Sequence, residues 1–250
     1  MGTGVDGRTL AVASVLAVLA GFVDAMGYIV LGGFFVSFMS GNTTRTGTAA
    51  VDGHWHTAAV GAGIIALFVV GVVAGSLVGN RWETWRQASV TFAVAVLIAV
   101  AAASVTVADG LVVAALALAM GVENAALDRG SGSALGLTYV TGTLVKFGRA
   151  IADALGGGPR WGWVAYGGLW LSLSSGVVAG ALVHRALGLE GLWFAVAVAV
   201  ALAVDGAVRA RRAGSARGVH DDGHAREAHD GAEDVPAVGP EAVDDHPPGQ

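Results

Sequence analysis

The sequence predicts an all-α membrane protein in which six transmembrane helices form two inverted three-helix repeats. Three observations lead to this prediction: the composition, the number of long apolar runs, and a similarity between the two halves of the chain. Of the 250 residues, 54% are hydrophobic and 13% are charged, and the mean hydropathy is +0.66. Soluble domains carry roughly 25% charged residues, so the composition excludes a soluble globular domain of this length.

Six apolar runs have the length of a membrane span, because a helix needs about 20 such residues to cross the hydrocarbon core. The first run follows Arg8 and so resembles a signal sequence. It continues past the region where such sequences are cleaved, so we expect it to be retained in the protein. The predicted spans are 10–31, 57–79, 88–107, 110–127, 163–183 and 191–208.

The basic residues predict the orientation of these spans. With both termini inside, eleven basic residues between Arg8 and Arg217 fall in inner segments and only Arg45 and Arg185 fall outside. Inner loops of membrane proteins carry such an excess, which makes residues 1–9 a short cytoplasmic N-terminus. The abundance of Ala, Gly, Val and Arg suggests a GC-rich bacterial genome. The predicted location is therefore the bacterial inner (plasma) membrane.

The two halves of the chain contain matching strings. GFVDA at 21–25 corresponds to GVENA at 121–125, and GVVAGSLV at 71–78 corresponds to GVVAGALV at 176–183. Matches of Gly, Ala and Val arise easily by chance, but these occur in register. We divide the membrane domain, 10–208, into repeat A (10–107) and repeat B (110–208). Three spans per repeat place the second copy upside down in the bilayer, as in many secondary transporters.

Two carboxylates lie inside predicted spans. Asp24 is about two-thirds of the way along the first span, and Glu123 with Asn124 takes the related place in the fourth. A charged side chain at this depth costs at least about 2.5 kcal/mol, which favours a proton relay or a cation site. A hydrogen bond between helices, or a protonated acid packed among small residues, is the alternative.

The segment between the first two spans is too apolar for a solvated loop, since it contains three phenylalanines. We expect a re-entrant or interfacial helix that starts near Thr43, capped by the polar residues from Ser40 on, and a copy after the fourth span that starts near Thr143. Such a helix start, with Arg45 or Lys146 beside it, suits an anionic group. An ordinary cap whose basic residue touches lipid phosphate is the alternative.

These considerations give one set of candidate substrate- or ion-binding residues, distributed over both repeats: Asp24, Ser40, Asn42, Thr43, Arg45, Glu123, Asn124, Thr141, Thr143 and Lys146. Glycines spaced four apart are assigned to close packing of helices instead. They are Gly71, Gly75, Gly79, Gly176 and Gly180.

Several functions are not expected. The chain has no cysteine, which excludes disulfides, thiolate metal sites and cysteine nucleophiles. The spans contain no catalytic or metal-binding motif, so we predict neither an enzyme nor a cofactor. No basic surface for nucleic acid is recognisable. The stretch 209–250 is rich in His, Asp, Glu and Pro and is predicted to be a disordered cytoplasmic tail without a metal site.

The string GFVDAMGYIVLGGFFVSFMSGNTTRTG at 21–47, followed by a glycine-rich second span, resembles the YoaK family of small bacterial multi-pass membrane proteins, a domain of unknown function. The resemblance covers roughly residues 10–208 and depends most on GFVDA and FMSGNTTR. It implies a polytopic inner-membrane protein. It brings no substrate, cofactor or catalytic residue.

Two functional hypotheses remain open. The first is a secondary transporter or permease for a small solute, for which an anion is one candidate, with the candidate residues forming a site near the middle of the membrane. The second is a membrane scaffold or accessory subunit, in which the same polar groups hold helices together. In both, the lipid bilayer is a partner, and the sequence leaves a homo-oligomer open.

Overall fold

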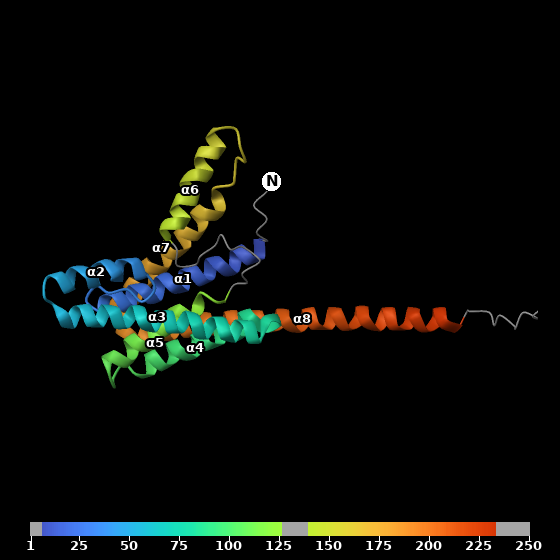
Figure 1. Cartoon of the computed structure of the whole chain (residues 1–250), viewed down its shortest axis with the longest axis horizontal. Helices are drawn as coiled ribbons and strands as arrows, with labels where there is room; N and C mark the ends of the chain where they lie inside the picture. The colour runs from blue at the N-terminus through green and yellow to red at the C-terminus, as the bar shows by residue number, and fades with distance from the viewer. Residues whose placement is uncertain (1–6, 127–139, 234–250) are drawn as a thin grey trace, which may run out of the picture. The chain divides into compact units, whose positions relative to one another are not determined.

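The computed structural model describes residues 7–126 and 140–233, and the regular structure in these ranges is helical. Short 3₁₀ helices at Glu83–Trp85 and Gly188–Gly191 separate longer elements. The α-helices are α1 (Gly7–Val30), α2 (Met39–Val51), α3 (Trp55–Arg81), α4 (Arg86–Ala103), α5 (Asp109–Glu123), α6 (Val140–Leu155), α7 (Val164–Leu187) and α8 (Leu192–Glu233) (Figure 1). The chain divides into two units, residues 1–208 and 209–250.

Four stretches within the described ranges are long and apolar enough to cross a membrane: 7–30, 55–81, 83–103 and 164–215. The last contains both α7 and the beginning of α8. Five of the predicted spans correspond to α1, α3, α4, α7 and α8. The remaining one corresponds to α5, which has 15 residues and is about 22 Å long, short of the roughly 30 Å hydrocarbon core. The fold is thus a multi-pass helical membrane protein, and the six-span count stays a prediction.

Glycines bring the backbones of α1 and α7 into direct contact. A Cβ added at Gly176 would overlap the carbonyl oxygen of Val18, and one added at Gly180, one turn later, would overlap that of Phe22. From the other side, Gly21 meets the backbone of α7 in the same way. Helix backbones approach this closely only where a residue lacks a side chain. Because the contacts advance in the same direction along both helices, α1 and α7 are parallel.

The contact between α3 and α5 is built in the same way. A Cβ at Gly71 would overlap the carbonyl oxygen of Leu118, and one at Gly75 would lie 2.8 Å from the carbonyl oxygen of Val122. Gly121 on α5 faces the backbone of α3 in return. These two helices are also parallel. The predicted packing role is confirmed for Gly71, Gly75, Gly176 and Gly180, whereas Gly79 faces the Arg86 side chain.

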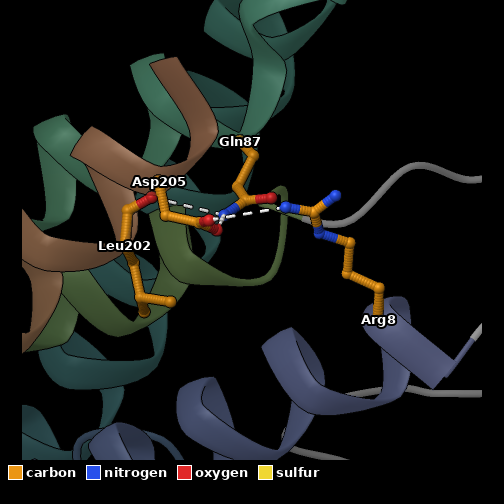
Figure 2. A network of polar contacts seen from close by, with 4 residues as sticks. All are labelled: Arg8, Gln87, Leu202 and Asp205. Carbon is orange, nitrogen blue, oxygen red and sulfur yellow. Dashed lines mark hydrogen bonds and ion pairs between the residues drawn. The ribbon is translucent and has the colours of Figure 1, made fainter. Parts of the chain in front are cut away.

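A polar network joins three helices at one end of the first unit (Figure 2). The Arg8 guanidinium on α1 lies 3.9 Å from the Asp205 carboxylate on α8. The side-chain amide of Gln87 on α4 donates to the carbonyl oxygen of Leu202 at 3.3 Å and to Asp205 at 3.4 Å. Both charged side chains are substantially exposed, 59% and 42%, so the ion pair itself contributes about 0–1 kcal/mol.

Helix α8 continues to Glu233 and so includes part of the region 209–250, for which the sequence predicts disorder. Alanine and arginine, which favour helices, are frequent just after residue 208. The first proline after the membrane domain that could end the helix is Pro236. Low hydrophobicity therefore indicates the absence of a packed core, but it does not by itself prevent a helix. Residues 234–250 of the predicted tail lie outside the described residues.

Candidate solute and ion site

The site is built around a break in the chain between α1 and α2, residues 31–38. It begins with Gly32 and Gly33, whose φ angles are +56° and +101°. Only glycine adopts such angles without strain, so this pair lets the chain leave α1 and turn back. The amide of Gly33 still donates to the carbonyl oxygen of Tyr28 at 2.8 Å, which closes the end of the helix.

Asp24 on α1 holds the middle of this break. One carboxylate oxygen, Oδ1, accepts the backbone amide of Val36 at 2.7 Å and that of Ser37 at 2.9 Å. Backbone donors are strong partners for a carboxylate. Asp24 is therefore linked to main chain more than ten residues further on, and it fixes where the break lies against α1.

Asn42 on α2 holds the preceding residue of the break. Its side-chain oxygen accepts the amide of Phe35 at 2.9 Å, and its side-chain nitrogen donates to the carbonyl oxygen of Phe35 at 2.7 Å. The Asn42 side chain is fully buried. One amide side chain thus satisfies both polar groups of a residue that is in neither helix, as buried main chain requires.

Arg45, one turn further along α2, completes the set of contacts. Its guanidinium donates to the carbonyl oxygen of Gly32 at 2.6 Å and lies 4.4 Å from the centre of the Phe34 ring. A Cβ at Gly33 would overlap the guanidinium, so the glycine also makes room for the arginine. Arg45 carries five N–H donors, and the contact with Gly32 uses one of them.

The structure therefore brings Asp24, Asn42 and Arg45 together on one eight-residue break, each through the main chain. Among the described residues, the ion pair found involves Arg8 and Asp205, and not Asp24 with Arg45. The sequence expectation that the candidate residues form one binding site near the middle of the membrane stays a prediction.

Helix α2 begins at Met39, four residues before the predicted start at Thr43, and has no side-chain cap. Ser40 and Thr43 consequently lie inside the helix and are exposed. The Thr43 hydroxyl donates to the carbonyl oxygen of Met39 at 2.9 Å, as threonine does within helices. These polar residues therefore lie in the first turn of α2 and do not cap it, and Phe38 occupies the N-cap position.

In the second half of the chain, Glu123 is the last residue of α5 and Asn124 is its C-cap. The Glu123 side chain is 0% exposed, and neither of its oxygens has a hydrogen-bond partner among the described residues. The Asn124 side chain donates to the carbonyl oxygen of Met120 at 2.8 Å. Asp24 is the charged group that acts on Glu123.

The remaining candidates, Thr141, Thr143 and Lys146, lie on α6. This helix begins at Val140, three residues before the predicted start, and ends at Leu155. It packs on α7, where the ring of Phe147 comes against Gly167. The segment between Ala126 and Val140, which corresponds in the proposed repeat to the break after α1, lies outside the described residues.

A groove of about 670 Å³ lies elsewhere, between α4 and the first part of α8. Its lining is apolar apart from Ser89, and Trp82 and Trp85 are part of it. None of the candidate site residues lines it. Tryptophan at the end of a span is typical of the membrane interface, so this groove belongs to the lipid-facing surface.

Sequence reasoning missed the residues that shape the break. Gly32 and Gly33 are its turning point, and Phe34 is the surface on which Arg45 lies. A Gly-Gly pair that ends an apolar run is a recognisable turn signal. Asp205, a carboxylate three residues before the end of the sixth predicted span, was likewise an available signal for the contact with Arg8.

The fold and the site together define a multi-pass α-helical membrane protein with a break held by polar side chains after its first span. The chain belongs to the family described as "Protein of unknown function (DUF1275)", whose model matches residues 12–204. YoaK proteins belong to this family, which confirms the resemblance seen in the sequence.

A curated relative supports this assignment. The chain is similar to UPF0700 transmembrane protein RA0705 of Rhizobium meliloti (strain 1021), with 36% identity over 184 residues. The match covers 74% of this chain and 80% of the relative. No solved structure matches the chain.

Proposed function

We propose that this protein is a secondary transporter or permease for a small anionic solute, built from two inverted repeats in the bacterial inner membrane with both termini in the cytoplasm. The observation that carries the proposal is the break at residues 31–38, which three polar side chains hold inside a helical membrane unit. In this proposal the protein is not an enzyme and needs no cofactor. Its partners are the bilayer and the solute.

The glycine contacts support the inverted repeat. In an inverted repeat, the first span corresponds to the fourth and the second corresponds to the fifth. The contact between α1 (the first span) and α7 (the fifth) then corresponds to the contact between α5 (the fourth) and α3 (the second). In both contacts the two helices are parallel, and glycines pack against backbone carbonyl groups. In a six-span topology the first and fifth spans run outward, whereas the second and fourth run inward. The corresponding pairs are then opposite in direction, as an inverted repeat requires.

The break supports a binding role. In transporters of this plan, substrates bind where spans are discontinuous, because main chain outside a helix offers donors and acceptors at membrane depth. Here the discontinuity lies between α1 and α2, and the proposed repeat expects its counterpart between α5 and α6, outside the described residues.

The chemistry of Arg45 supports an anion. A guanidinium presents donors in a planar fork that matches carboxylate and phosphate groups. Arg45 is partly buried beside Phe34 and Gly33, so a ligand there would meet a fixed cation with N–H donors beyond the one that binds Gly32.

The test is a thermal-shift screen of the purified full chain against a panel of small inorganic and organic anions and matched neutral solutes. A ligand at 100 times its Kd stabilises by about 2.7 kcal/mol, so a genuine hit raises Tm. Arg45→Ala should lose the shift, whereas Arg81→Ala should keep it, since Arg81 is exposed at the end of α3. A hit should then be taken up by vesicles that contain the protein.

A scaffold or accessory subunit is the second candidate, and a specific observation favours it. The hydrogen bonds of Asp24 and Arg45 go to the break itself, to the main chain of Gly32, Val36 and Ser37 and to the Ser37 side chain, as expected if these two residues have a structural role. This reading predicts that no solute in the panel shifts Tm and that Asp24→Asn is nearly silent. Uptake of any solute that depends on Arg45 would exclude it.

A further inference from the structure

Two carboxylates in the membrane unit have opposite surroundings. Asp24 accepts two backbone amides through one oxygen. Glu123 is 0% exposed, and both of its oxygens lack a hydrogen-bond partner in the part of the chain that the structure describes. Hydrogen bonds to backbone donors stabilise a carboxylate anion, whereas a buried anion without a partner is strongly disfavoured. Asp24 is thus held by hydrogen bonds, whereas the Glu123 carboxyl is buried without one.

Among the described residues, no cation is paired with Glu123. From α1, the charge that acts on it is the carboxylate of Asp24. From α3, the residues opposite this part of α5 are Gly71 and Gly75. The buried cation of α4 is Arg86, whose guanidinium donates to Asn80 at 3.1 Å and lies over Gly79.

A metal ion fits this position poorly. Metal cations of the kind that carboxylates bind need a shell of several oxygen ligands, and no group of three or more metal-binding side chains is present in the described ranges. Of the residues that flank Glu123 in the chain, Val122 and Ala125 are buried and apolar, and the Asn124 side chain donates to the carbonyl oxygen of Met120. A proton needs no further ligand, because it binds one carboxyl oxygen and removes the charge.

We propose that Glu123 is a proton-binding site of this protein, occupied in the conformation described here. Asp24 then acts as a positioning residue for the break, and Glu123 is the group that gains and loses the coupling proton. Release requires that one Glu123 oxygen reach water or a basic partner, which links proton loss to a change in the packing of α5. The coupling role rests on the proposed transport function, whereas the proton itself can be detected without any solute.

The test is the infrared spectrum of the purified full chain at neutral pH, in which a protonated carboxyl gives a C=O stretch separate from ionised carboxylates and shifted by deuteration. The wild-type protein should show this band. Glu123→Gln should lose it. Glu83→Gln is the matched control, since Glu83 is exposed in the 3₁₀ helix before α4, and it should keep the band, as should Asp24→Asn.

Glu123→Leu guards against a folding artefact. Because the carboxyl has no polar partner to lose, an apolar residue of similar length should be accommodated, and this variant should also lack the band while keeping the wild-type Tm. Absence of the band from the wild type, or its persistence in folded Glu123→Gln or Glu123→Leu, would overturn the proposal.

The two proposals can fail separately. A Glu123 band in a protein that no solute stabilises would leave the proton site standing and count against transport. Uptake of a solute by a protein without the band would leave transport standing and remove Glu123 as the carrier of the proton.

Discussion

Asp24 joins the first span to a segment that follows it by twelve residues, through two backbone amides on one oxygen. A side chain in this position has a structural task that is separable from its charge, because an amide oxygen accepts the same hydrogen bonds as a carboxylate oxygen. Asp24→Asn therefore tests the charge of Asp24, whereas Asp24→Leu tests its hydrogen bonds.

Asp24→Asn should therefore be mild and Asp24→Leu severe. Hydrogen bonds to a charged group contribute about 1.5–3 kcal/mol each, so loss of both in Asp24→Leu should lower the stability by about 3 kcal/mol or more. Asn keeps an acceptor and should cost about 1 kcal/mol. The measurement is thermal unfolding in detergent followed by tryptophan fluorescence, for which the chain has seven tryptophans. Equal Tm values for the two variants would contradict the role given to Asp24.

The two glycines of the break make a matched pair for Arg45. Gly32 and Gly33 both have positive φ, but a Cβ at Gly32 meets nothing within 4 Å, whereas one at Gly33 overlaps the Arg45 guanidinium. Gly32→Ala should cost about 1–2 kcal/mol of backbone strain. Gly33→Ala should cost more, and the excess should vanish in an Arg45→Ala background. A double-mutant cycle on Tm measures this coupling, and additive effects would show that the guanidinium lies elsewhere.

At the scale of the helices, the contact of α7 with α1 depends on particular glycines and not on glycine content. Gly176 faces the carbonyl of Val18, whereas Gly168 on the same helix has nothing within 4 Å of an added Cβ. Gly176→Ala should therefore destabilise by about 1–3 kcal/mol through overpacking. Gly168→Ala should be neutral or stabilise by about 0.5–1 kcal/mol, because alanine favours a helix.

The corresponding pair on α3 gives an internal control for the repeat. Gly71 faces Leu118, and Gly63 is open. If the two halves are equivalent, Gly71→Ala should cost about as much as Gly176→Ala, and Gly63→Ala should match Gly168→Ala. Unfolding of the four variants under one condition measures this. A large cost at only one of the two closely packed glycines would weaken the argument for equivalent halves.

Most of the membrane helices could be predicted from the sequence, because a helix that crosses the membrane needs an apolar run of a certain length. The runs that correspond to α1, α3, α4, α7 and α8 are of this kind. The end of α5 could not be predicted, because the apolar run continues through Ala126, whereas the helix ends at Glu123. The continuation of α8 to Glu233 was also missed, since helix propensity acts there without burial.

The polar side chains that hold the break could be recognised in the sequence, but their contacts could not. Asp24, Asn42 and Arg45 stand out because polar groups in an apolar segment are costly. Their partners are main-chain atoms of Gly32, Phe35, Val36 and Ser37. A main-chain atom has no signature in the sequence, and its place depends on how the chain turns at the two glycines. The isolation of Glu123 depends likewise on three-dimensional packing.

At the scale of the whole molecule, α5 decides the topology. With its 15 residues it is shorter than the roughly 20 usually needed to span, although a locally thinned bilayer or the residues that flank the helix can make up such a difference. If α5 crosses the membrane, the membrane unit has six spans and the repeat can be inverted. If it does not, five spans remain, the second half cannot mirror the first, and α7 would run opposite to α1, against the parallel contact of these two helices.

Two single cysteines separate these cases, because the chain has no cysteine of its own. Thr48 on α2 and Ser215 on α8 are exposed, and each can be replaced by cysteine and treated in intact cells with a membrane-impermeant maleimide. With six spans, Thr48→Cys should be labelled from outside and Ser215→Cys only after the membrane is opened. Five spans would place both on the same side, since an even number of spans would then separate them. Labelling of Ser215→Cys alone in intact cells would keep six spans but reverse the orientation that the basic residues predict.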